Sequence, residues 1–150
     1  MLELIKAQLQ SGVPFASFVG INIDFLDAET AIASLPAKPE LTNHIATVHA
    51  GAMFTLAEAA SGAAMAAALA PMLMHTRPVA AQARVRYLKP ATGDLTASAR
   101  ASRTSTDLLS SLQSDGVVRF DVDVMISDAN GANVAEVTVE WHVRTNVGIS

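Results

Sequence analysis

Cysteine is absent from all 150 residues of the chain. Disulfide bonds, thiolate metal sites and cysteine nucleophiles are therefore excluded. Aromatic residues are scarce at 5%, and charged residues reach only 16% against 51% hydrophobic residues. A surface with so few charges favours an oligomer, a homodimer or a dimer of dimers, because another copy of the chain would cover part of the apolar surface.

The first residues of the chain lack the basic stretch and long apolar run that mark a signal peptide. We therefore expect a single cytoplasmic domain, which suits a chain of this length. The segment 50–74 has the length of a membrane span. Its apolarity comes mostly from alanine and it contains Glu58, so we favour a buried helix and expect no contact with a membrane.

Three motifs that would indicate a particular chemistry are also missing. The chain has no G-x-S-x-G nucleophile elbow, no phosphate-binding P-loop and no dinucleotide-binding glycine pattern. His44, His75 and His142 show no metal-binding spacing with carboxylates and are interpreted as surface or packing residues. The sequence thus predicts neither a metal nor another cofactor.

The net charge of -4 argues against general nucleic-acid binding. The basic residues are nevertheless concentrated, because seven of the ten lie between residues 77 and 119, where only three acids occur. This segment is a solvated strand face or a site for an anionic ligand such as a nucleotide phosphate. From the sequence alone we favour the solvated face.

The hydrophobic pattern predicts an α+β fold with two strands, one long helix and four further strands. Alternation of apolar and polar residues indicates an antiparallel sheet of about six strands with one covered face. The long helix is rich in alanine, which lets a sheet approach it closely. The expected helices are 2–10, 14–20 and 51–69, and the expected strands are 21–25, 30–35, 82–87, 95–102, 120–126 and 137–143.

Glu58 is the only charged residue between positions 52 and 70, where ten of the nineteen residues are alanine. A carboxylate in such surroundings is costly unless it has a use or a partner. Its pKa should be raised by the apolar environment, toward the range of a useful general base. The alternative is a structural carboxylate that backbone N–H groups or a tyrosine satisfy.

The order of elements, with Asn43, His49-Ala50-Gly51 and Glu58 at this spacing, resembles the hotdog fold. The chain is most similar to the small acyl-CoA thioesterases related to the phenylacetate-pathway thioesterase, including its uncharacterised DUF4442-type relatives. The resemblance covers nearly the whole chain. The segment 86–91 also resembles the tyrosine-x-x-proline strand end of that family.

The resemblance implies hydrolysis of an acyl-CoA to a free acid and CoA, at sites shared between two subunits. Glu58 would activate water or attack directly, and Asn43 would position water or the carbonyl. The backbone N–H groups of Ala50 and Gly51 lie at the expected helix start, where unpaired donors can stabilise an oxyanion. Two departures are Ala50 in place of the family's usual glycine and Ala80 in place of a serine or threonine. For His49 we favour a structural role over that of a base.

Several further interpretations stay open at this stage. Lys89, Arg100 and Arg103 are candidates for contact with the CoA phosphates. Ser61-Gly62 is a close-packing point rather than a nucleophile. The methionines of the helical region are expected to line the core or an acyl pocket, namely Met53, Met65, Met72 and Met74. The main alternative function is an acyl-CoA or lipid-binding module without turnover, and a hotdog dehydratase is the weaker third.

Overall fold

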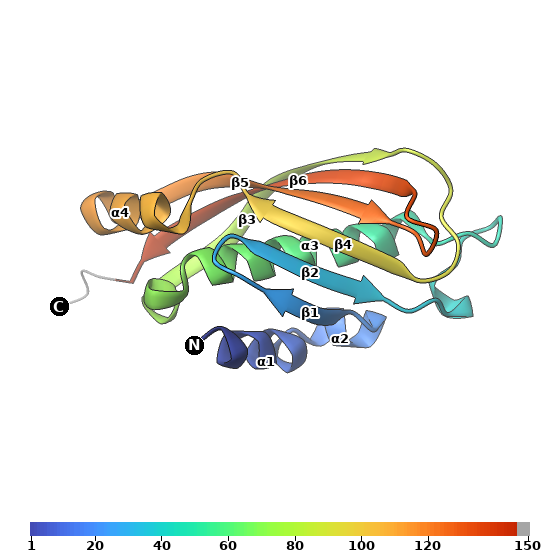
Figure 1. Cartoon of the computed structure of the whole chain (residues 1–150), viewed down its shortest axis with the longest axis horizontal. Coiled ribbons are helices and arrows are strands. Elements are labelled where there is room, and N and C mark those ends of the chain that lie inside the picture. Colours follow the sequence, from blue (N-terminus) through green and yellow to red (C-terminus); the bar gives the residue numbers. More distant parts are fainter. Residues whose placement is uncertain (147–150) are drawn as a thin grey trace.

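A computed structural model describes residues 1–146 and contains a curved antiparallel sheet packed on one long helix (Figure 1). The helices are α1 (Leu2–Gly12), α2 (Pro14–Val19), α3 (Ala50–Ala68) and α4 (Ser105–Asp115), with short 3-10 helices η1 (Pro39–Leu41) and η2 (Ala70–His75). The strands are β1 (Asn22–Leu26), β2 (Thr30–Leu35), β3 (Thr76–Tyr87), β4 (Leu95–Ala101), β5 (Val117–Ser127) and β6 (Asn133–Thr145). The predicted order of two strands, a long helix and four strands is confirmed.

The six strands form one sheet in the order β1-β2-β4-β5-β6-β3, with antiparallel pairing throughout. Strand β4 buries every second residue, from Leu95 to Ala101, and β5 follows the same rule. This is the period-two burial that the sequence pattern predicts for a sheet with one covered face. The opposite face carries most of the polar residues of these strands and is exposed to solvent.

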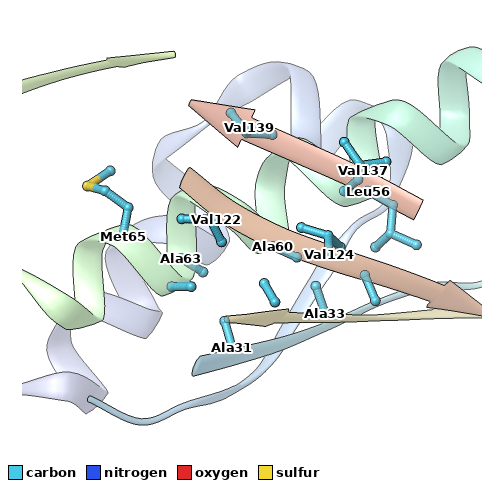
Figure 2. Packing of buried hydrophobic residues seen from close by; sticks show 14 of the residues in the cluster. Ala31, Ala33, Leu56, Ala60, Ala63, Met65, Val122, Val124, Val137 and Val139 are labelled. Carbon is cyan, nitrogen blue, oxygen red and sulfur yellow. The ribbon is translucent and has the colours of Figure 1, made fainter. Parts of the chain in front are cut away.

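Helix α3 supplies the surface on which the sheet packs. Ala57, Ala60 and Ala63 are fully buried, together with Leu56. In Figure 2 the labelled side chains of Leu56, Ala60 and Ala63 lie on the side of α3 toward β5 and β6, which carry Val122, Val124, Val137 and Val139, while Met65 leaves the helix in another direction. Alanine has helix propensity and little bulk, so the helix can run close beneath several strands at once. The other side of α3 is covered in part by α1 and α2 (Figure 1).

Strand β3 departs from the expected burial pattern. It pairs only with β6, forms one edge of the sheet, and is exposed over most of its length on both faces. The prediction that one face of this strand is covered is therefore wrong for a single chain, because α3 lies under the other five strands and makes few contacts with β3. The result is a long unpaired edge.

Helix α4 has no counterpart in the expected elements. Thr104 caps its first turn by accepting a hydrogen bond from the Asp107 N–H, and Leu108 and Leu112 are fully buried one turn apart. Gly116 ends the helix in the left-handed conformation, with φ of 71°. An Asp-Gly pair is also typical of a turn between strands, but here Asp115-Gly116 ends the helix.

Among residues 1–146, no helix combines the length and apolarity that a bilayer crossing requires.

Candidate active site

The loop before α3 is held by the side chain of Asn43. Its Oδ1 accepts hydrogen bonds from the backbone N–H groups of Ile45 (3.1 Å) and Thr47 (3.0 Å), and its Nδ2 donates to Thr47 Oγ1 (2.7 Å). Ala46 at the tip has a positive φ of 61°, a conformation that costs a non-glycine residue energy. Within one chain Asn43 thus braces a strained turn, while the role of positioning water or the carbonyl stays a prediction.

His49 is the N-cap of α3. Its Nδ1 accepts a hydrogen bond from the Gly51 N–H at 2.8 Å, and its own backbone N–H donates to the Leu41 carbonyl. This contact gives His49 the structural role favoured from the sequence. It also occupies the Gly51 N–H, which was expected to be a second oxyanion donor.

The Ala50 N–H has a different environment. Within residues 1–146 it has no hydrogen-bond acceptor, and the residue is exposed at the first turn of α3. The Tyr87 hydroxyl donates to the Ala50 carbonyl at 3.2 Å and so ties the end of β3 to this turn. A free N–H at a helix N-terminus can donate to a developing negative charge, so Ala50 carries the free donor of this pair.

Glu58 lies two turns further along α3 and lines a cleft between α3 and the two N-terminal helices. The carboxylate is half-buried, and burial raises the pKa of Glu58 above its ordinary value. Among the described residues its side chain makes no ion pair and no hydrogen bond. The structural alternative for this carboxylate therefore has no contact to support it within one chain.

The walls of the cleft are almost entirely apolar. It encloses about 590 Å³ including its open mouth. The lining also contains the polar side chain of Gln10. Its amide is already hydrogen-bonded to the backbone of Ile21 and Ile23. The lining residues are Leu9, Gln10, Val13, Ala16, Ile21, Ile23, Glu58, Ala59, Gly62, Met65 and Trp141.

The sequence did not identify Gln10, Val13, Ala16 or Trp141 as parts of a site. Trp141 was visible as the single tryptophan of the chain, and its place on an alternating strand indicated that it points inward. The contribution of α1 and α2 had no such signal, because their position over α3 is a tertiary arrangement. Sequence reasoning thus found the carboxylate of the cleft and Met65 in its wall, but not the walls that α1 and α2 contribute.

Ser61 is packed rather than reactive. Its hydroxyl is fully buried, donates to the Glu58 carbonyl at 2.8 Å and accepts from Trp141 Nε1 at 3.3 Å. A Cβ on Gly62 would lie in ordinary contact distance of the Trp141 ring, 3.5 Å away. The interpretation of Ser61-Gly62 as a close-packing point is confirmed.

The methionines divide into core, cleft and surface. Met53 is buried, Met65 lines the cleft, and Met72 is half-buried. Met74 is 76% exposed, so the expectation that it lines the core or a pocket is wrong for a single chain. It lies in η2, after Pro71 has ended the regular helical pattern, and the turn directs it to solvent.

The three cationic candidates do not meet in one chain. Lys89 lies between the end of β3 and the start of β4. Arg100 lies on the exposed face of β4, and Arg103 follows the end of that strand. Arg103 is already paired with Asp107 at 2.6 Å. Because β4 spans seven residues, about 20 Å of strand separates the surroundings of Lys89 from those of Arg103.

A six-stranded antiparallel sheet packed on one long central helix defines a protein of the hotdog fold class. The chain belongs to the family described as domain of unknown function DUF4442, whose model matches residues 2–143. No curated protein matches the sequence.

Several solved structures share the fold. A Pseudomonas aeruginosa protein described as a probable thioesterase is 24% identical, with 97% of this chain and 96% of that chain aligned and a TM-score of 0.83. A mutant of a Staphylococcus aureus thioesterase is 14% identical over 88% and 99% of the two chains, with a TM-score of 0.73. The Escherichia coli PaaI protein of the phenylacetic acid degradation operon is 19% identical over 94% and 92%, with a TM-score of 0.70.

Proposed function

We propose that the protein hydrolyses an acyl-CoA thioester to a free acid and CoA. The observation that carries this proposal is Glu58, a carboxylate with a raised pKa in an apolar cleft and with no partner among residues 1–146. Such a group is a suitable general base or nucleophile near neutral pH. The thioesterases among the structures of the same fold support the choice of reaction.

The reaction follows from two groups on α3. Glu58 accepts a proton from water while the water oxygen attacks the thioester carbonyl carbon. The negative charge that develops on the carbonyl oxygen is stabilised by the Ala50 N–H. When the tetrahedral intermediate collapses, the C–S bond breaks, the acid is released, and the thiolate of CoA takes up the proton. In the variant with direct attack, the Glu58 carboxylate displaces the CoA thiolate and forms a mixed anhydride. Water then hydrolyses the anhydride, which releases the acid and restores Glu58.

One chain cannot bring these two groups to the same carbonyl. Glu58 is eight residues after Ala50, so the two lie about 12 Å apart along the helix axis. We propose a homodimer in which Glu58 of one subunit faces the Ala50 N–H of its partner. The free edge of β3 is the candidate interface, because a long exposed edge with apolar residues is otherwise an aggregation hazard.

The apolar cleft also suits the alternative function, an acyl-CoA or lipid-binding module without turnover. Its walls would hold an acyl chain whether or not Glu58 acts on it. Ala50 and Ala80 depart from the family pattern, and these departures support the alternative of binding without turnover. Measurement of turnover separates the two functions.

The test is release of CoA from a panel of short, long and aromatic acyl-CoAs, followed with a thiol-reactive dye. Because the chain has no cysteine, the dye reports only released CoA. We expect turnover by the wild type and a loss of at least about a hundredfold in kcat for Glu58→Gln. Glu3→Gln, an exposed carboxylate on α1, is the matched control and should retain full activity. Binding of an acyl-CoA without any turnover would favour the binding module.

A further inference from the structure

Four arginines from separate parts of the chain gather at one end of the solvent-exposed sheet face. Arg77 of β3 lies directly opposite Arg144 of β6, and Arg119 of β5 lies opposite His142, two residues before Arg144. Arg103 comes from the segment between β4 and α4. We call Arg77, Arg103, Arg119 and Arg144 the arginine cluster.

Three members of the cluster line an open cleft between α4 and the adjoining ends of β5 and β6. The cleft encloses about 670 Å³ including its mouth, and it is lined by Arg103, Ser111, Asp115, Val117, Val118, Arg119 and Arg144. The Arg103 guanidinium donates to Ser111 Oγ at 2.7 Å, which fixes its position at the rim. Arg119 and Arg144 lie on the exposed faces of β5 and β6, and the cleft shares no lining residue with the cleft that holds Glu58.

The charges of the cluster are poorly compensated. Among residues 1–146, the only ion pair of the cluster joins Arg103 to Asp107, and no carboxylate lies within ion-pair distance of Arg77, Arg119 or Arg144. Like charges placed directly opposite each other on a sheet, as in Arg77 and Arg144, are destabilising. Asp115 in the cleft and Glu140 near Arg119 offset only part of this charge.

Arginines elsewhere on the same face are arranged differently. Arg86 forms an ion pair with Glu136 at 3.1 Å. Arg100 lies directly opposite Asp123. An ordinary solvated strand face would be expected to repeat this alternation of sign. The arginine cluster interrupts this alternation of charge sign, and the interruption lies at the cleft.

We infer that the arginine cluster binds the phosphate groups of a nucleotide. Guanidinium groups present forked donors that match phosphate oxygens, and several of them around a cleft suit a ligand with at least two negative charges. Such a ligand is either the nucleotide end of the CoA substrate or a separate nucleotide. The first case rests on the proposed function, and the second does not.

The binding test uses adenosine 3′,5′-bisphosphate and inorganic pyrophosphate as probes in isothermal titration calorimetry at low salt. We expect the wild type to bind both and Arg144→Gln to raise the Kd about tenfold, the effect of losing one charge-assisted contact. Arg119→Gln tests the same cleft from the neighbouring strand. Arg84→Gln removes one charge from the same sheet face outside the cluster and should leave the Kd unchanged.

The proposal is overturned if the wild type binds neither probe, or if Arg84→Gln weakens binding as much as Arg144→Gln. Two substrates then separate the sources of the nucleotide. If the cleft holds CoA, Arg144→Gln raises the KM for an acyl-CoA about tenfold but leaves that for the matching acyl-pantetheine, which lacks the nucleotide, unchanged. If it holds a separate nucleotide, both KM values stay unchanged while probe binding still falls. Failure of the proposed hydrolysis leaves the calorimetric result intact.

Discussion

At the scale of single residues, the proposed chemistry depends on two polar groups of α3 that have no partner among residues 1–146. Glu58 has its carboxylate in an apolar cleft, and Ala50 has a free N–H at the first turn. Glu58 could be predicted as a functional candidate from the sequence, because a single charge inside an alanine-rich helix is conspicuous. The distinction between the N–H groups of Ala50 and Gly51 could not, since it depends on the rotamer with which His49 caps the helix.

The ionisation of Glu58 should control the acid side of the pH profile. A base must be deprotonated, so kcat/KM rises as the pH increases through the pKa of Glu58. Burial raises that pKa above its ordinary value of 4.5, so the acid limb should have its midpoint above pH 4.5. A pH series of kcat/KM measures this midpoint. A midpoint at or below 4.5 would contradict the role of Glu58, and the residual rate of Glu58→Gln should lack this limb.

Ala50→Pro should remove the oxyanion donor without disturbing the helix. Proline is favoured in the first turn, where its missing N–H has no helical partner, and the ψ of 138° at His49 is compatible with a following proline. We expect kcat to fall by about 10² to 10³. Ala50→Gly keeps the N–H and is the matched control. Equal activity of the two variants in the thiol-release assay would exclude this N–H from catalysis.

At the scale of elements, the strands and α3 were predictable, while α4 and the walls of the cleft were not. Alternation over 95–102 and 120–126 gives the strands because burial on one sheet face imposes a period of two. The segment 105–115 has only Leu108 and Leu112 as buried residues, too few for a clear helical period. The helix is marked in the sequence only by the capping residue Thr104 and by Gly116. Both residue types are also common in turns, so they do not identify a helix by themselves.

The alanine face of α3 sets the spacing between the helix and the sheet. Ala60→Leu adds bulk at a fully buried position that faces the strands (Figure 2). We expect it to lower the free energy of unfolding by about 1–3 kcal/mol, the usual cost of overpacking. Ala7→Leu on the exposed side of α1 is the control, and urea denaturation compares the two. A stable Ala60→Leu would show that helix and sheet do not pack closely here.

At the scale of the whole molecule, the exposed apolar surface that one chain leaves uncovered is concentrated at β3. Val79 on this strand is 52% exposed, and the neighbouring Ala80 and Ala81 are exposed as well. The low charge content of the chain predicted an apolar surface that a partner covers, but not which strand carries it. Strand order decides that, because β3 pairs with β6 and with no other strand in the described part of the chain.

A shared active site predicts that two inactive variants restore each other. Glu58→Gln and Ala50→Pro, unfolded and refolded together, should give mixed dimers in which one of the two sites is intact. Activity should then recover to about a quarter of the wild-type value, the share expected from random pairing. Each variant refolded alone is the control. Absence of recovery, with dimers present in light scattering, would place both groups of a site in the same subunit.

The pairing of β3 also has a consequence for how the chain is made. Tyr87 lies opposite Ala135 and Thr76 opposite Thr145, so β3 leaves the ribosome long before its partner strand has been synthesised. During this interval its apolar residues have neither β6 nor a second copy to cover them, and the loop that must close is long. Docking of β3 is therefore expected to be a late step of folding. Because Tyr87 holds the first turn of α3, the Ala50 N–H, the proposed oxyanion donor, would reach its final position only when the last strand is in place.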